Sequence, residues 1–346
     1  MKTKLICFIL ACLLSVPLTA CNSDQSSTDD DFQTVFQTDA YVPSPDYTDH
    51  ADVLSINGKN ITYEEYRYYY LNIKEKYDRG DDAYWNSHDY NSEIKAEALR
   101  YLSRQYAIEE LASEYGISLD EDDLEELEKT LKSNKDEFES ESEYNAYLDY
   151  LHLTDRSNYR LASVYSLEQK LFEYLSSEES DFVIHYAESL VDKFVSSQVF
   201  RGDWIILYND YGDDKNENRS LAELIIENVN NGEKFATLKA QYSEDSKTSS
   251  NPDGQLMFKG EYDKEIEDAV LSLESGKVSN VIETPYGFIV ATRYELDEKY
   301  KEENYHTVIV PYYQQSMFEI MLKKLIEKQT VIYFDTYDGL NVNTVK

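Results

Sequence analysis

The chain of 346 residues has only 11 glycines and 6 prolines, which excludes a collagen-like or Gly/Pro-rich disordered protein. Hydrophobic residues make up 41% of the chain, enough for folded cores, and the length favours more than one folded unit. The formal net charge of −35 argues against a nucleic-acid partner, because binding to nucleic acid requires Lys and Arg to neutralise phosphates.

Residues 1–21 have the pattern of a lipoprotein signal peptide. A short basic start is followed by an uncharged apolar run that is too short to span a bilayer. The run ends in Leu-Thr-Ala-Cys at 18–21, which resembles the bacterial lipobox, so Cys21 is the expected lipidation site. The alternative is an ordinary signal peptide with a chance Cys. Because Cys7 and Cys12 lie inside the signal, the mature chain would have no internal disulfide.

Residues 22–50 are rich in Ser, Asp, Gln and Thr and have no helical period, which predicts a flexible tether. Together with the lipidation site, this predicts a protein anchored in a membrane by lipid. A mature chain with one Cys favours the extracellular face of a Gram-positive type of cell membrane, and a Gram-negative periplasm is the alternative.

The region 51–199 is predicted to be mainly helical. A short strand over 51–58 precedes a capping box of Thr62 and Glu65, and a second capping box is expected at Ser118 and Glu121. Apolar residues at helical spacing mark further helices. The stripes comprise Tyr66, Tyr69, Tyr70, Ile73 and Tyr77; Leu99, Leu102, Tyr106, Ile108, Leu111 and Tyr115; Leu124, Leu127 and Leu131; Tyr144, Tyr147, Leu148 and Leu151; Leu161, Val164, Tyr165, Leu171, Phe172 and Leu175; and Val183, Ala187, Leu190, Val191 and Phe194.

The pattern changes near Val199 to short strands alternating with short helices. We expect strands over 204–207, 256–258, 278–282 and 288–294, with a hairpin at 285–287. We expect helices from Ser220, as N-cap, to Val229, and over 235–242 and 265–273. A last helix is predicted from about Pro311 to Lys328.

Residues 201–296 resemble a parvulin-type peptidyl-prolyl isomerase domain. The matching motifs are Asn-Gly-Glu-Lys-Phe-Ala at 231–236, Tyr-Ser-Glu-Asp at 242–245, Gly-Gln-Leu at 254–256, the stretch 260–269, Gly-Lys-Val-Ser at 276–279 and Thr-Pro-Tyr-Gly at 284–287. The flanking helices, with Asn57-Gly58 and Ile61-Thr62 before the first of them, are similar to the chaperone region of PrsA-like foldase lipoproteins and of SurA.

This resemblance implies an α+β fold, in which a mostly helical chaperone domain carries an inserted, parvulin-like antiparallel sheet of the FKBP-like superfold. The corresponding domains are a signal peptide at 1–21, a tether at 22–50, a helical chaperone region at 51–199, a parvulin-like domain at 200–296 and, at 297–346, a C-terminal helix that packs on the chaperone region.

The resemblance also implies a peptide-binding groove, and some residues of this sequence differ there from the family pattern. The family has a His on the first strand, where this sequence has Trp204, and a His on the last strand, where it has Ile289. Asp245 matches the family position that is Cys or Asp, and is the one candidate catalytic residue; the alternative is an ordinary surface Asp. The groove residues implied are Trp204, Leu256, Phe258, Tyr262, Ile266, Thr284 and Ile289.

Tyrosine is unusually frequent, with 32 residues. One interpretation is a client-binding surface of Tyr68, Tyr69, Tyr70, Tyr144, Tyr147 and Tyr150, because Tyr combines apolar area with a polar tip. The other is that most of these rings fill helix faces at the core.

These observations predict an extracytoplasmic foldase or chaperone whose partners are unfolded or partly folded secreted polypeptides and, through lipid on Cys21, the membrane. Two alternatives stay open: an active peptidyl-prolyl cis-trans isomerase, and a surface lipoprotein that docks one folded partner. A homodimer also stays open. We expect no cofactor and no metal site, since the sequence has no Walker motif, dinucleotide fingerprint or His/Cys metal cluster.

Overall fold

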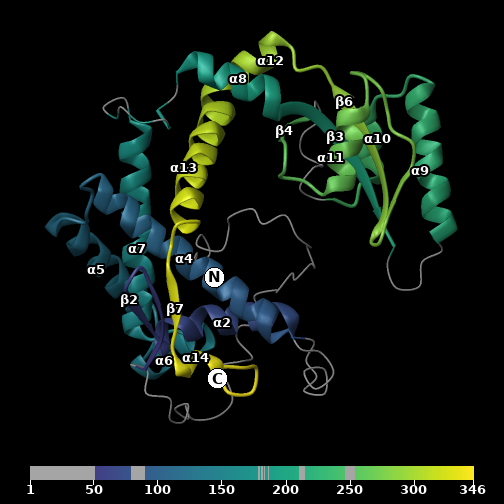
Figure 1. The fold of residues 1–346 in the computed structure, drawn as a ribbon. Helices are drawn as coiled ribbons and strands as arrows, with labels where there is room; N and C mark the ends of the chain where they lie inside the picture. The colour runs from purple at the N-terminus through teal and green to yellow at the C-terminus, as the bar shows by residue number, and fades with distance from the viewer. Residues whose placement is uncertain are drawn as a thin grey trace. The chain divides into compact units, whose positions relative to one another are not determined.

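The computed structural model describes residues 51–78, 90–177, 180, 182, 184–185, 187–209, 215–245 and 254–346. The predicted signal peptide, the tether and Cys21 lie outside these residues. The chain divides into two compact units. The described residues up to His185, together with Gln315–Lys346, form the first, which we call the split unit; the residues between Tyr186 and Gln314 form the second, which we call the inserted unit (Figure 1).

The split unit contains a three-stranded sheet and several long helices. Its elements are β1 (Asp52–Ile56), β2 (Lys59–Thr62), α2 (Tyr63–Tyr77), α4 (Asn91–Glu114), α5 (Glu121–Lys135), α6 (Glu141–Tyr150), α7 (Asp155–Ser176), the greater part of α13 (Val310–Ile326), β7 (Val331–Tyr333) and α14 (Asp335–Asp338). The sheet has the order β2-β1-β7 and is antiparallel throughout. Because Leu54 pairs with Tyr333, this sheet joins the two ends of the described chain.

Helix α2 begins where the sequence predicts. The Thr62 side chain caps it by accepting a hydrogen bond from the backbone N–H of Glu65 at 3.5 Å. Its predicted stripe is buried, with Tyr66, Tyr70 and Ile73 in the core. The same burial bears on the two interpretations of the tyrosines.

The rings of four tyrosines assigned to a client-binding surface are buried in the core; they are Tyr68, Tyr69, Tyr70 and Tyr144. Tyr150, in contrast, is 52% exposed. Burial of these four rings agrees with the second interpretation, that tyrosines fill helix faces; the sequence left both open because tyrosines at helical spacing look the same whether their stripe faces solvent or the core.

The capping box predicted at Ser118 is wrong. Helix α5 is capped by Asp120, which accepts hydrogen bonds from the N–H groups of Asp122 and Asp123, both at 3.1 Å, while the Asp123 carboxylate accepts from the N–H of Asp120 at 2.8 Å. An Asp and an Asp three residues later satisfy the same orphan donors as the Ser/Glu pair would, and only the backbone decides between them.

A second core of the split unit brings α4, α7 and α13 together. Its buried residues are Ala107, Ile108, Leu111, Ala112, Val164, Leu171, Leu175, Ile184, Phe318 and Leu322. At its edge Arg104 of α4 forms ion pairs with Glu168 of α7 and Glu319 of α13, both at 2.7 Å. The residues after Gln314 therefore complete a core that is begun by residues before His185.

The inserted unit is built on a four-stranded antiparallel sheet of order β4-β3-β6-β5. Its elements are α8 (Glu188–Gln198), β3 (Val199–Tyr208), α9 (Lys215–Asn230), α10 (Phe235–Tyr242), β4 (Gln255–Phe258), α11 (Lys264–Ser272), β5 (Ile282–Thr284), β6 (Gly287–Tyr294), α12 (Glu298–Asn304), the π-helix η2 (Tyr305–Ile309) and the start of α13. The α+β fold predicted from sequence is confirmed by these helices and the two small antiparallel sheets.

Several element boundaries in this unit differ from the prediction. The strand expected over 204–207 is β3, which extends from Val199 to Tyr208. Helix α9 begins at Lys215, so Ser220 lies inside the helix and is not its N-cap. The strand expected over 278–282 is β5, shifted to Ile282–Thr284, and Val278 forms only an isolated bridge with Thr292.

Each face of the inserted sheet has its own core. One face, covered by α11, buries Phe200, Trp204, Ile206, Met257, Ile266, Val270, Ile289 and Ala291. The opposite face, covered by α9 and α10, buries Ile205, Leu207, Ala222, Ile225, Phe235, Leu238, Phe288 and Val290. Gly202 allows α11 to approach β3, because a Cβ there would lie 2.6 Å from Val270 and 2.9 Å from the Met257 sulfur.

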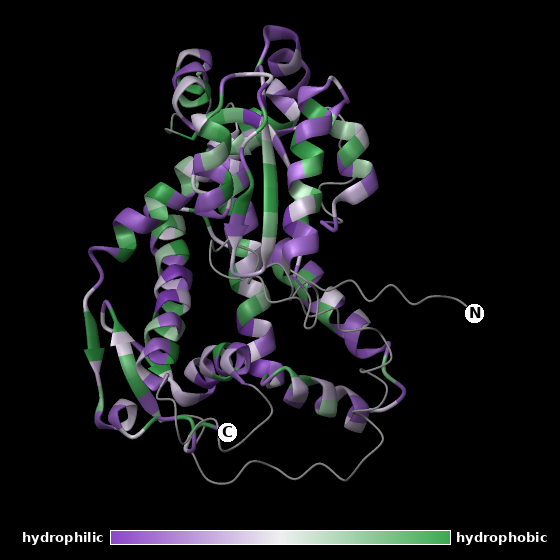
Figure 2. Ribbon diagram, turned by 90° about the vertical axis from the view of Figure 1, so that its right-hand side faces the viewer, coloured by the Kyte–Doolittle hydropathy of each residue, from purple (hydrophilic) through white to green (hydrophobic). Residues whose placement is uncertain are grey.

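Hydrophobic and hydrophilic stretches alternate along the helices of both units (Figure 2), as expected for helices that bury one face. Among the described residues, none of the helices combines the length and the apolar composition needed to cross a membrane.

Candidate functional site

The expected catalytic position on the first strand of the inserted sheet holds Trp204, whose indole contacts Asp245. The Trp204 Nε1–H donates a hydrogen bond to Asp245 Oδ2 at 3.1 Å. Asp245 follows α10 and is brought to this place because the preceding residues run along the edge of β3. The Glu244 N–H donates to the Ile206 carbonyl at 3.0 Å, and the Ile206 N–H donates to Ser243 Oγ at 3.4 Å.

Tyr262, which precedes α11, packs against the same indole. The two rings meet edge to face, with centroids 5.4 Å apart and planes at 70°. The Tyr262 hydroxyl donates to the carbonyl oxygen of Leu256 at 3.3 Å, which ties the ring to β4. Burial raises the pKa of Tyr262 to about 12, so the phenol is neutral at physiological pH.

Ile266 and Ile289 complete the apolar side of the site. Ile289 is fully buried on β6, directly opposite Ile206 of β3, and Ile266 of α11 packs in the same cluster as Trp204. The structure thus brings together five of the predicted residues: Trp204, Asp245, Tyr262, Ile266 and Ile289.

Leu256 and Phe258 lie on the other face of the sheet. Residues on β4 alternate between the two faces, and Met257 is the one that joins the cluster of Trp204. Phe258 stacks instead on Tyr312 of α13, with ring centroids 3.6 Å apart and planes at 14°. The period of two along this strand was the signal that could have identified Met257.

Thr284 has a structural contact at the hairpin between β5 and β6. Its hydroxyl donates to the Gly287 carbonyl at 3.0 Å and accepts from the Gly287 N–H at 3.1 Å. It therefore fixes the turn that begins β6, the strand that carries Ile289.

A buried ion pair beside the site was not predicted from the sequence. Lys239 Nζ of α10 lies 2.9 Å and 2.7 Å from the two carboxylate oxygens of Asp203, and the side chains are only 2% and 0% exposed. Asp203 Oδ1 also accepts the N–H of Trp204 at 2.9 Å. Burial raises the pKa of Asp203 to about 6 against the opposing effect of Lys239, and the Asp245 charge adds to the rise. In the sequence, the feature that could have indicated this ion pair is Asp203, a charged residue within a mostly apolar strand.

The cluster has little acid–base chemistry. In the inserted unit the sequence has one His, His306, and it lies in η2, outside this cluster. Within the part of the chain that the structure describes, no group of three His, Cys, Asp or Glu side chains is placed to hold a metal ion. The arrangement is an apolar face with a single carboxylate held by an indole.

Comparison with known proteins assigns the inserted unit to a family. The family model described as the PPIC-type PPIase domain matches residues 191–295, which cover most of this unit and all of the residues of the site. The inserted unit is therefore a parvulin-type domain, the class of protein that its sheet and helices define.

The relatives that the chain resembles are foldase proteins named PrsA. It is 27% identical over 128 residues to a foldase protein PrsA of Halalkalibacterium halodurans, covering 36% of this chain and 38% of that protein. It is 24% identical over 298 residues to a foldase protein PrsA of Caldanaerobacter subterraneus subsp. tengcongensis, covering 83% and 81%. A crystal structure of foldase protein PrsA from Streptococcus pneumoniae covers 80% of this chain and 92% of its own, with 18% identity and a TM-score of 0.34.

The matched segment spans less than two-fifths of the first of these relatives. The chain is similar to foldase proteins named PrsA, and its residues 191–295 match the PPIC-type PPIase domain.

Proposed function

We propose that this protein is a membrane-anchored, extracytoplasmic foldase that binds unfolded secreted polypeptides, and that the prolyl isomerase activity of its inserted unit is weak or lost. The match to the PPIC-type domain and the relatives that are named foldases support the first part. The lipoprotein pattern that ends at Cys21 supports the anchor.

The observation that carries the second part is the contact between Trp204 and Asp245. Isomerisation must overcome a barrier of about 20 kcal/mol in the amide bond, and the resemblance implies a polar network for the twisting carbonyl. Here the two expected imidazoles are replaced by Trp204 and by Ile289, and the remaining carboxylate accepts a hydrogen bond from the indole. Binding a twisted prolyl bond gives some acceleration without acid–base help, which leaves room for weak activity.

The negative charge of the protein should influence which clients it binds. With a formal net charge of −35, the surface attracts basic segments and repels acidic ones, and we expect basic or neutral clients to associate faster at low salt.

The foldase proposal is tested by aggregation of an unfolded client, followed by light scattering. We expect suppression at a several-fold excess of the protein, and stronger suppression for a basic client than for an acidic one of similar length. No suppression of either client would contradict the proposal.

The isomerase proposal is tested by a protease-coupled assay on prolyl peptides, with an active parvulin as the positive control. We expect a rate close to the uncatalysed background for the native protein, and the same rate for Asp245→Ala. A rate well above background that falls in Asp245→Ala would instead support an active isomerase in which Asp245 is catalytic.

The anchor is tested by expressing the chain with Cys21→Ser in a Gram-positive host that is fed a labelled fatty acid. We expect label and membrane association for the native chain and neither for the variant. A native chain without label would contradict lipidation.

A further inference from the structure

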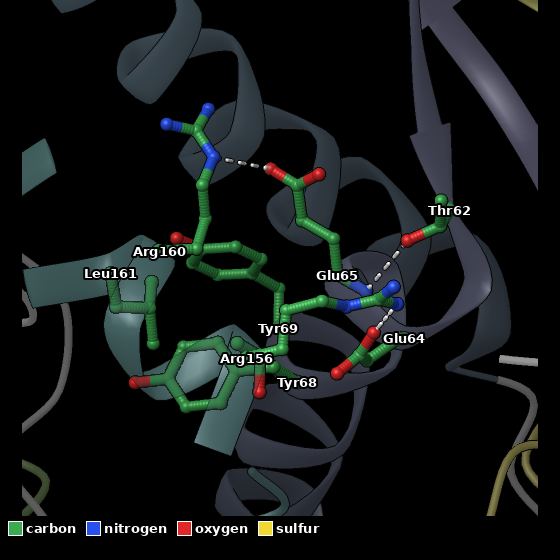
Figure 3. A pocket seen from close by; sticks show the side chains of 9 residues that line it. Thr62, Glu64, Glu65, Tyr68, Tyr69, Arg156, Arg160 and Leu161 are labelled. Atoms are coloured by element: carbon green, nitrogen blue, oxygen red, sulfur yellow. Dashed lines mark hydrogen bonds and ion pairs between the residues drawn. The ribbon is translucent and has the colours of Figure 1, made fainter. Parts of the chain in front are cut away.

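The split unit contains a pocket between α2 and α7, with a volume of about 200 Å³. All of its lining residues belong to the split unit. They are Thr62, Glu64, Glu65, Tyr68, Tyr69, Arg156, Ser157, Arg160 and Leu161 (Figure 3). The pocket is therefore independent of the site in the inserted unit.

The walls of the pocket are mainly apolar. The rings of Tyr68 and Tyr69 meet edge to face, with centroids 4.9 Å apart and planes at 77°, and Leu161 lies beside them (Figure 3). All three side chains are almost fully buried, so the walls are fixed by the core behind them. Such a surface suits a flat apolar group.

The charges at the pocket are paired with one another. Glu64 contacts Arg156 and accepts a hydrogen bond from the Thr154 hydroxyl, and Arg160 contacts Glu109. Because two guanidinium groups and two carboxylates line the same small space, neither a free cation nor a free anion is favoured there.

One polar atom of the pocket has an unmet hydrogen bond. Glu65 Oε1 is buried and has no hydrogen-bond donor within reach among the described residues; Arg160 Nε is 3.8 Å away, too far for a hydrogen bond. The other oxygen, Oε2, accepts from the Tyr106 hydroxyl at 3.4 Å. Burial raises the pKa of Glu65 against the opposing charge of Arg160. A buried acceptor without a donor is costly, so this atom favours a ligand that brings a donor.

We propose that this pocket binds the side chain of a tyrosine in an unfolded client, with its ring against Tyr68, Tyr69 and Leu161 and its hydroxyl donating to Glu65 Oε1. The size is suitable, because a cavity of about 150 Å³ in another protein accepts benzene, and the additional volume admits a hydroxyl. This inference rests on the proposed function and names the side-chain class that its helical region recognises.

Competing side chains fit less well. Phenylalanine would fill the apolar walls but leave Glu65 Oε1 without a donor, and a site built to bond a hydroxyl discriminates against the analogue that lacks it. Lysine and arginine would bring a cation next to Arg156 and Arg160.

The experiment measures binding of two probes, N-acetyl-tyrosinamide and N-acetyl-phenylalaninamide, to the full chain by the NMR shifts of leucine methyl groups. We expect the Leu161 methyls to shift with both probes, and the tyrosine amide to bind about tenfold more tightly. Glu65→Met, which removes the acceptor, should reduce the affinity for the tyrosine amide to that of the phenylalanine amide. Glu126→Met, which makes the same change at an exposed position of α5, is the matched control and should bind like the native chain.

Equal affinities of the two amides for the native chain, or no shift at Leu161, would overturn the proposal. Free phenol is a third probe, and binding of phenol without binding of the tyrosine amide would also overturn it, because the ligand would then be a small molecule. The failure is distinguishable from that of the foldase proposal: suppression of client aggregation that persists while the tyrosine amide does not bind refutes only the pocket.

Discussion

The side chain of Trp204 has two structural roles in the inserted unit. Its ring contributes to the buried face of the sheet, and its single N–H serves the nearby Asp245. An indole is suited to this position because it combines a large apolar body with one donor. An indole has no basic nitrogen that could accept a proton, which is the property on which the proposal of weak or lost isomerase activity depends.

Trp204→Phe tests the structural part of this role. The ring is kept approximately and the donor is lost, so Asp245 loses its indole hydrogen bond. We expect the free energy of unfolding of the inserted unit to fall by about 1.5–3 kcal/mol, the range for hydrogen bonds to charged groups, as measured by urea titration.

Tyr286→Phe is the comparison for this change. It removes a hydrogen bond to Asp263 at an exposed place, where water replaces the partner, so a smaller loss is expected. Equal stability of Trp204→Phe and the native chain would contradict a stabilising role for the hydrogen bond from Trp204 to Asp245.

Asp203 predicts a pH dependence of the same unit. Burial raises its pKa from 3.8 to about 6 in the folded state, so folding favours the protonated form. Its contribution to stability is therefore fully present below pH 3.8 and is lost as the pH rises through 6, by up to about 3 kcal/mol.

The double variant Asp203→Asn, Lys239→Met should lack this pH-dependent change, because it removes both buried charges together. Urea titrations between pH 3.5 and 7 measure the effect. The control is Lys264→Met, Asp268→Asn, which removes an exposed ion pair of α11 and should keep the native pH dependence. An unchanged pH profile in the Asp203 variant would contradict the assignment.

The sequence located most of the candidate site but not its packing. Trp204, Asp245 and Ile289 were identified by their place in a family pattern, and the structure brings them to one sheet face or its edge. Leu256 and Phe258, which were named as groove residues, lie on the opposite face of β4 from Met257, because side chains alternate along a strand. The groove itself stays a prediction.

The longer secondary-structure elements could be predicted from the sequence, and the shortest ones could not. Helix α10 was predicted with its observed bounds, and the hairpin before β6 was marked by Pro285, Tyr286 and Gly287. Strand β7 has three residues and pairs with β1 at the other end of the chain, so no local pattern indicated it. The π-helix η2 was also missed, because its pattern does not differ from that of an ordinary helix.

The cap of α5 gives a test at this scale. Asp120→Ala should lower the melting temperature of the split unit clearly, because it removes the hydrogen bonds to two N–H groups and a partner of Lys170. Ser118→Ala, at the position that the sequence pattern favoured, should leave it unchanged.

The hydrogen bond from Lys170 lowers the pKa of Asp120 to about 2. The stabilising effect of its charge is therefore present above pH 3.8 and is lost as the pH falls through 2. Equal melting temperatures of the two variants at neutral pH would contradict the observed cap.

At the scale of the whole molecule, the split unit depends on residues from both ends of the described chain. The last residues contact the first helices through side-chain hydrogen bonds: Lys74 donates to the Val342 carbonyl at 2.8 Å, Lys95 to Tyr337 at 2.7 Å and Gln329 to Ser103 at 2.9 Å. The domain boundaries expected at 199, 200 and 296 stay a prediction beside the division at His185 and Gln314.

Helix α13 buries Phe318 and Leu322 in the second core, and truncation of the larger side chain tests this packing. Phe318 is fully buried against residues of α4 and α7. Phe318→Ala should reduce the free energy of unfolding of the split unit by about 3–5 kcal/mol, the range for large core truncations.

Ile320→Ala, two residues along the same helix, is the control. Ile320 is 43% exposed, and its truncation should change stability by less than about 0.5 kcal/mol. Chemical denaturation followed by circular dichroism measures both variants. Similar losses for the two would contradict the packing of α13.

The sheet order β2-β1-β7 also determines when the split unit can finish folding during synthesis. Synthesis delivers the amino end first, so β1 and β2 emerge without the strand that completes their sheet, and Val331–Tyr333 follows much later. The residues between Tyr186 and Gln314 can meanwhile form their own contacts. The inserted unit can therefore complete its sheet while the sheet of the split unit still lacks its third strand.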